Sequence, residues 1–91
     1  MTFSFRVRVK HGNGTPVRRK WVSVIFLNHG DRSVGSSSAM TNSQGIAAFK
    51  EVFAHMPGLP VKAKFSLDNF ESTCEGGPYF VAEGSSLVIA I

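Results

Sequence analysis

The chain has little of what stabilises or anchors many small secreted proteins. It contains one cysteine, Cys74, so it cannot form an internal disulfide, which argues against a disulfide-rich secreted scaffold. No apolar run approaches the roughly 20 residues that span a bilayer. From Phe3 onward the chain alternates apolar and polar residues, whereas a signal peptide has a basic stretch followed by an apolar one. We therefore expect a cytoplasmic protein that makes no membrane contact.

Motifs for catalysis or metal binding are also missing. The three histidines fall in or beside expected loops, without the spacing of a compact metal site: His11, His29 and His55. The acidic residues form no close pair: Asp31, Glu51, Asp68, Glu71, Glu75 and Glu83. No phosphate-binding loop is present, and nothing near Cys74 would activate a thiol. We expect no enzyme activity, no cofactor and no metal; a zinc site assembled from two histidines and Cys74 is the unsupported alternative.

Short extended segments dominate what is present. In residues 3–10 four apolar side chains alternate with polar ones, the period-two pattern of a half-buried strand. Further strands are expected at residues 17–27, 61–67, 79–82 and 87–91, with a short edge strand near 37–41, between turns rich in Gly, Asn, Ser and Pro. The length of 91 residues suits one domain. These features predict a single all-β sandwich over residues 1–91, with about seven strands.

Residues 45–56 fit two structures. Their apolar residues recur at helical spacing, with Ser43 as a cap and Pro57-Gly58 as a stop: Ile46, Phe49, Val52, Phe53 and Met56. Alternation from Ile46 to Glu51 fits a strand as well, and periodicity cannot decide over so short a run. On pattern alone the helix is slightly favoured. The alternative fold is therefore an α+β domain, in which one helix at 45–56 packs on an antiparallel sheet.

Four stretches resemble, in order, the pattern of the prealbumin-like (transthyretin-like) β-sandwich superfamily. They are residues 5–9 (FRVRV), 14–17 (GTPV), 22–24 (VSV) and 41–49 (TNSQGIAAF). Carboxypeptidase regulatory-like and Cna B-type domains of this superfamily open with a strand, a glycine turn, Pro-Val and a Val-rich strand. A later Thr-Asp-x-x-Gly turn leads into Ala-x-Phe. The resemblance implies an immunoglobulin-like or prealbumin-like sandwich and a strand after Gly45, and it implies no particular function.

Basic residues gather in the first third of the chain. Residues 1–32 hold seven Lys or Arg against one acid, in a chain of net charge +4. Arg6, Arg8 and Lys10 share one face of the first strand, about 6–7 Å apart. If the first two strands form a hairpin, one positive patch results, a candidate polyanion-binding surface: Arg6, Arg8, Lys10, Arg18, Arg19, Lys20 and Trp21. Such a patch would attract nucleic-acid phosphates or another polyanion. The alternative is that these charges only keep an edge strand soluble.

Apolar residues also occupy faces that a two-layer sandwich turns towards water. The candidate interface consists of Trp21, Ile25, Leu27, Val88 and Ala90. A loop or a second subunit would have to cover them, and a homodimer through sheet faces or edges is one solution. The leading prediction is therefore a non-catalytic binding or assembly module that self-associates or binds a partner protein. Polyanion or nucleic-acid binding is the alternative, and carbohydrate binding on Trp21 and Tyr79 is a weaker one.

Overall fold

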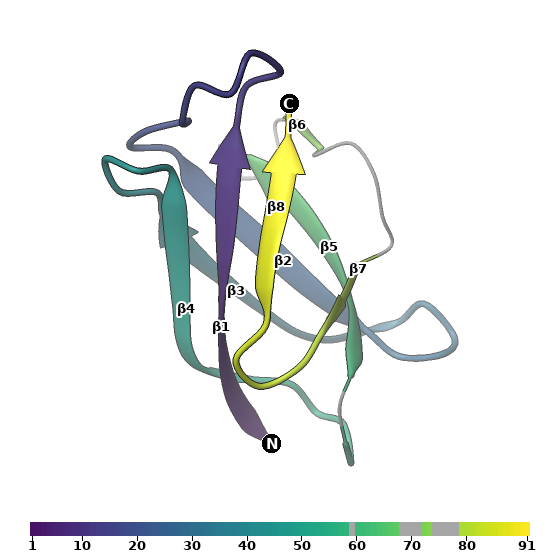
Figure 1. Cartoon of the computed structure of the whole chain (residues 1–91). Helices are drawn as coiled ribbons and strands as arrows, with labels where there is room; N and C mark the ends of the chain where they lie inside the picture. The colour runs from purple at the N-terminus through teal and green to yellow at the C-terminus, as the bar shows by residue number, and fades with distance from the viewer. Residues whose placement is uncertain (59, 68–71, 74–78) are drawn as a thin grey trace.

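Two β-sheets lie face to face in the computed structural model, which describes residues 1–58, 60–67, 72–73 and 79–91 (Figure 1). The strands are β1 (Thr2–Lys10), β2 (Trp21–Leu27), β3 (Ser33–Met40), β4 (Ile46–Phe53), β5 (Val61–Leu67), β6 (Ser72–Thr73), β7 (Tyr79–Val81) and β8 (Ser86–Ala90). No helix occurs among the described residues. The predicted all-β sandwich is therefore confirmed, and the two-residue β6 accounts for the difference from about seven strands.

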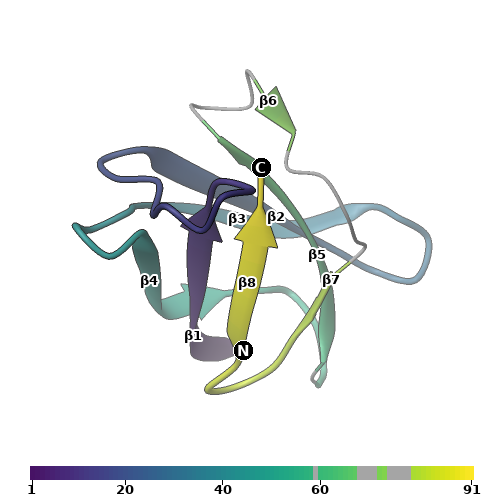
Figure 2. The ribbon, with the colours of Figure 1, turned by 45° about the horizontal axis from the view of Figure 1, so that its top comes forward.

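The first sheet has the order β4–β1–β8. β1 pairs antiparallel with β4 and parallel with β8, so the first and last strands lie side by side (Figure 2). β1 is thus the central strand of this sheet. It alternates as its sequence predicts, with its four apolar residues buried: Phe3, Phe5, Val7 and Val9.

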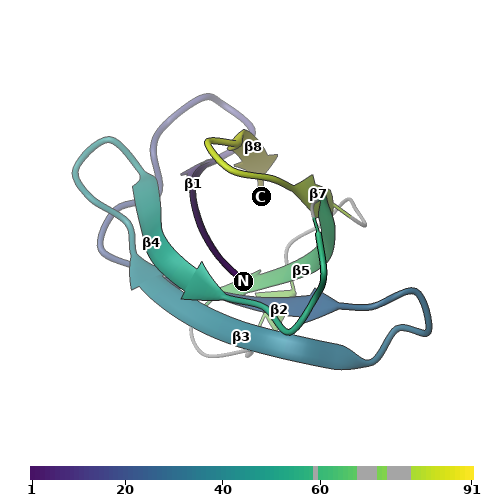
Figure 3. The ribbon, with the colours of Figure 1, turned by 90° about the horizontal axis from the view of Figure 1, so that it is seen from below.

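The second sheet has the order β3–β2–β5–β6, and β7 also pairs with β5. β2 pairs with β3 and β5 and lies in the layer opposite β1, as Figure 3 shows from below. The hairpin between the first two strands, which was the condition for a single positive patch, therefore does not form. Residues 11–20 cross between the layers instead, and the Val17 N–H donates to the Val9 carbonyl at 3.0 Å to hold the crossing against the end of β1.

Phenylalanine rings fill the space between the sheets. Phe5 stacks on Phe49 with ring centroids 4.8 Å apart. It also makes edge-to-face contacts with Phe26 and Phe65 of the second sheet. Aromatic pairs of this kind contribute about 0.5–1.5 kcal/mol beyond the area they bury. The rings thus join the first sheet to the second, and Ile89 of β8 is fully buried beside them.

The segment after Gly45 is a strand, so the helix over 45–56 is wrong. Ala47, Phe49 and Val52 are its buried residues, a spacing of two and then three. The three-residue step arises from a β-bulge, where the β1–β4 register shifts and Glu51 takes a φ of 50°. The inserted residue interrupts the period of two, and this interruption produced the apparent helical spacing.

Candidate functional site

A row of three cations stands on the outer face of the first sheet. Arg6 and Arg8 are exposed and Lys10 is partly exposed, all on alternate positions of β1. Their cross-strand neighbours are small or aliphatic: Ala48 and Ser86 flank Arg6, and Ile46 and Val88 flank Arg8. Because β1 is held by strands on both sides, the bases of these side chains are fixed about 6–7 Å apart. We call Arg6, Arg8 and Lys10 the basic row.

An open groove of about 480 Å³ lies over the paired strands β4 and β1, and Arg6 is the member of the basic row that lines it. Ala48 lies among its lining residues, Arg6 and Lys50 contribute positive charge, and Asn42 and Gln44 contribute amides. Asn42 also shapes the turn, since its Oδ1 accepts hydrogen bonds from the N–H groups of Gln44 and Ile46 at 2.8 and 3.0 Å. The groove can therefore offer hydrogen-bond donors and positive charge to an anionic or polar ligand.

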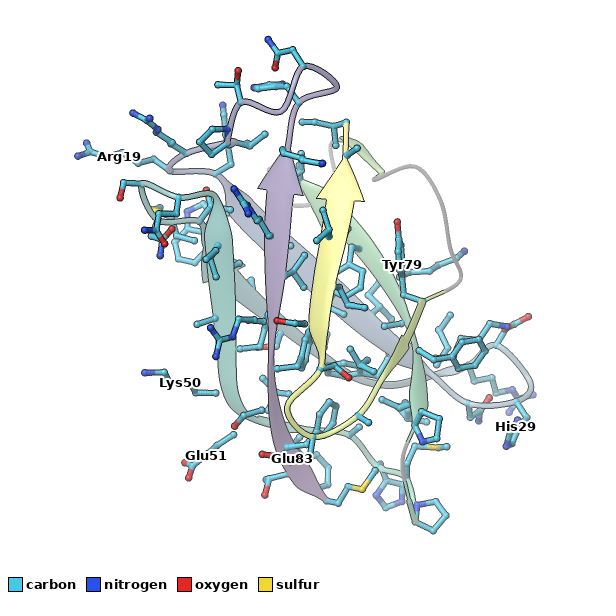
Figure 4. All side chains as sticks on the ribbon, viewed as in Figure 1. Arg19, His29, Lys50, Glu51, Tyr79 and Glu83 are labelled. Atoms are coloured by element: carbon cyan, nitrogen blue, oxygen red, sulfur yellow. The ribbon has the colours of Figure 1, made fainter. Side chains whose placement is uncertain are left out.

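One end of the groove carries an acidic side chain, Glu83. Glu83 Oε2 accepts a hydrogen bond from the Ser4 N–H at 2.8 Å, at a point of β1 that β8 does not reach. The Ser4 hydroxyl in turn accepts from the Glu51 N–H at 2.9 Å and so holds the bulge. Figure 4 shows Lys50, Glu51 and Glu83 towards one end of the sheet and Arg19 at the other. The outer face is thus polarised, with positive charge increasing from Ser4 towards Lys10.

The second basic cluster, Arg18 to Lys20, lies at the positive end. The Arg19 N–H donates to the Thr41 carbonyl at 3.2 Å, and the Thr41 N–H donates to the Lys20 carbonyl at 2.9 Å. The Val9 N–H donates to the carbonyl of Gly45 at 2.8 Å, so the turn at residues 41–45 touches both β1 and the cluster. This turn, and not a hairpin, thus links the cluster to the end of β1 that carries Lys10. Trp21 begins β2 in the other sheet, 43% exposed and in register with Met40.

The candidate interface residues do not form one surface. Trp21, Ile25 and Leu27 lie on the outer face of the second sheet, whereas Val88 and Ala90 lie on the outer face of the first. Leu27 is already buried at 8% exposure, and Ile25 is half-buried. Only part of the expected apolar surface is therefore open to a partner. On the first sheet Val88 remains 58% exposed.

β8 forms a free edge of the first sheet. The Arg6 N–H donates to the Ser85 carbonyl at 3.0 Å, and the Ile91 N–H donates to the Lys10 carbonyl at 2.9 Å. In a parallel pair of strands every second residue bonds to the partner strand, so the backbone N–H and C=O groups of Leu87 and Ile89 also point towards β1. The N–H and C=O groups of Val88 and of its neighbours at 86 and 90 therefore point away from β1, where no other described strand pairs with them.

The remaining chemistry-bearing residues are dispersed. Within the described ranges no three His, Cys, Asp or Glu residues lie close enough to hold a metal ion. The three histidines are exposed. Lys62 Nζ lies 2.5 Å from Asp31 Oδ1, and the hydrogen bond and charge of Lys62 hold the pKa of Asp31 below its usual range. Cys74, Asp68, Glu71 and Glu75 lie outside the described residues, as do the expectations on them and the zinc alternative that includes Cys74.

The fold and the site together define a small all-β sandwich with a polarised basic face and an uncharged edge strand, β8. Comparison of the chain with known protein families, with curated proteins and with solved structures finds no match. In the described part of the chain there is no helix that could cross a membrane.

Proposed function

We propose that this protein is a non-catalytic assembly module, an immunoglobulin-like sandwich of the prealbumin-like type that forms homodimers through β8. The observation that carries the proposal is the unprotected edge. Residues 86–91 (SLVIAI) contain no charge and no proline, the devices by which natural edge strands avoid pairing. A cytoplasmic location is part of the proposal, supported by the single cysteine.

β8 is a better pairing edge than the edge of the second sheet. Along β3 the His55 N–H already donates to the Val34 carbonyl at 2.7 Å, and the Phe53 carbonyl oxygen would lie 2.5 Å from a Cβ built on Gly35. The segment that follows β4 thus closes on part of β3. β8 has no comparable described neighbour, and Val88 keeps its side chain in solvent beside its outward N–H and C=O.

A second copy fits this edge by symmetry. Two antiparallel β8 strands related by a twofold axis place Val88 opposite Val88 and Ser86 opposite Ala90, which gives about six new backbone hydrogen bonds. The two Arg8 residues then lie three strand spacings apart, about 14 Å. This separation exceeds the Debye length of about 8 Å at physiological salt, so repulsion between the basic rows is screened. The result is one continuous sheet of two three-stranded halves.

Analytical ultracentrifugation of the wild type and of matched variants tests the proposal. We expect a dimer at high micromolar concentration. Val88→Pro removes an N–H that points outward and leaves every hydrogen bond to β1 in place, whereas Val88→Lys places a charge on the edge. Both variants should sediment as folded monomers. Ala48→Lys adds the same charge to the same sheet face on β4 and should remain dimeric. A monomeric wild type, or dimers of both Val88 variants, would overturn the proposal.

A further inference from the structure

The position of the basic row shows that its charges do not serve to protect an exposed sheet edge. Charged side chains on a strand commonly protect an exposed edge from pairing. β1 is not an edge: it lies between β4 and β8 and pairs with both. Of the two strands at the edges of this sheet, β8 carries no charge. Edge protection therefore does not account for the three cations on β1.

The cations of this face also have no counterion among the described residues. Among the described residues, Arg6, Arg8, Lys10 and Lys50 have no carboxylate within ion-pair distance. On the other side of the molecule Lys62 is paired with Asp31. Glu83 is the acidic side chain of the groove, and it accepts a hydrogen bond from the backbone of Ser4. The positive charge of the row is thus available to a ligand.

The surroundings of the row leave space for such a ligand. Ala48, Ser86 and Ala90 are its short neighbours, and the groove of about 480 Å³ opens along Arg6 towards Asn42 and Gln44. The turn at residues 41–45 then leads to Arg18 and Arg19, which extend the positive region. None of the cross-strand neighbours of the row is aromatic, so no ring is placed there for stacking on a base.

We propose that the outer face of the first sheet binds the phosphate groups of a linear polyanion, a nucleic-acid backbone or inorganic polyphosphate. The basic row supplies charges at a regular interval, the groove beside Arg6 admits a phosphate, and the cluster at Arg18 and Arg19 continues the track. Binding depends on charge and not on base identity. This proposal is independent of dimer formation, because no residue of the row belongs to the outward edge of β8.

Fluorescence anisotropy with a labelled oligothymidylate of about 20 nucleotides tests the proposal across a range of salt concentrations. We expect saturable binding that weakens as salt rises. For single strands, log K falls with log[salt] by about 0.7 for each phosphate neutralised. The double variant Arg6→Gln, Arg8→Gln should therefore weaken binding at least about tenfold at low salt and reduce the slope by about 1.4.

The matched control removes two charges from elsewhere. Arg32 and Lys64 are exposed residues beside and on the second sheet, and Arg32→Gln with Lys64→Gln should change affinity less than about twofold. Unlabelled polyphosphate should displace the oligonucleotide. The Val88→Pro variant should bind as the wild type does, which separates this test from that of dimer formation. Equal losses in the two double variants, no saturable binding, or no displacement by polyphosphate would overturn the proposal.

Discussion

Four glycines separate the cost of backbone strain from the cost of a steric clash. Gly45 has both: its φ is 77°, and an added Cβ would lie 2.5 Å from the Val9 carbonyl oxygen. Gly14 has the positive φ alone, at 91°, with nothing within 4 Å. Gly35 has the clash alone, 2.5 Å from the Phe53 carbonyl oxygen. Gly12 has neither, so it is the control for substitution itself.

The expected losses of stability on substitution by alanine follow from these differences. A left-handed φ costs a non-glycine residue about 1–2 kcal/mol, which is the expectation for Gly14→Ala. Gly45→Ala adds overpacking of about 1–3 kcal/mol, because Val9 bonds to both Gly45 and Val17 and cannot move away freely. Its total is about 2–5 kcal/mol. Gly12→Ala should be neutral or stabilise by up to about 1 kcal/mol through the unfolded state.

Urea denaturation followed by circular dichroism measures these free energies of unfolding. Gly35→Ala should lose about 1–3 kcal/mol from overpacking alone. If Gly45→Ala proves too unstable at room temperature, an osmolyte such as trimethylamine oxide restores a measurable transition. A loss for Gly45→Ala within about 0.5 kcal/mol of that for Gly14→Ala would refute the tight packing of the turn against β1.

Three further predictions test the core, the bulge and the ion pair. Phe49→Ala should cost about 3–5 kcal/mol in urea denaturation, whereas Phe53→Ala, on the same strand but 55% exposed, should cost less than about 1 kcal/mol; similar losses would contradict the strand over residues 46–53. Ser4→Ala removes the acceptor of the bulge amide and should cost about 0.5–1.5 kcal/mol, with a faster exchange of that amide by NMR. In an NMR pH titration the pKa of Asp31 should lie below 3.8 and rise in Lys62→Gln. Because the pKa of Asp31 is lowered in the folded protein, the ion pair stabilises the fold at pH values above the unfolded pKa, and this stabilisation is lost as the pH falls through the folded pKa. An unchanged Asp31 pKa in the variant would show that the pair does not form in solution.

Side-chain direction could be predicted from the sequence wherever the period of two was unbroken. Along β1 every apolar residue from Phe3 to Val9 is buried, and Arg6 and Arg8 are exposed, as the alternation predicted. Burial of one face is enough to fix such a register, because a slip of one residue exposes all the apolar side chains. The two-layer core followed from this pattern in several strands.

The topology could not be predicted in the same way. Alternation tells which face of a strand is buried, but not which sheet the strand joins, so whether β1 and β2 pair was left as a condition, and they do not pair. The parallel pairing of β1 with β8 joins residues from the two ends of the chain, and nothing local in the sequence indicates it. The bulge at Glu51 was missed because a non-glycine residue with positive φ leaves no sequence signal, and the helix interpretation followed from it.

The candidate site was predicted in part. The basic row was found because its residues alternate on one strand, but the residues that complete the groove come from other elements. Lys50 and Glu83 lie far from β1 in sequence, and only the fold brings them beside it. Asn42 carried a weak signal, since a Thr-Asn-Ser-Gln-Gly sequence is typical of a turn. That β8 lies at an edge follows from the strand order, which the sequence does not reveal. The sequence shows only that this strand carries no charge.

Amide hydrogen exchange in β8, measured by NMR at two protein concentrations, tests the central claim most directly. The Leu87 and Ile89 amides face β1 and should be protected at both concentrations. The Val88 amide faces the open edge, so it should exchange rapidly in dilute protein and become protected in concentrated protein, together with the amides of residues 86 and 90. A Val88 amide that exchanges rapidly in concentrated protein would contradict assembly through this edge.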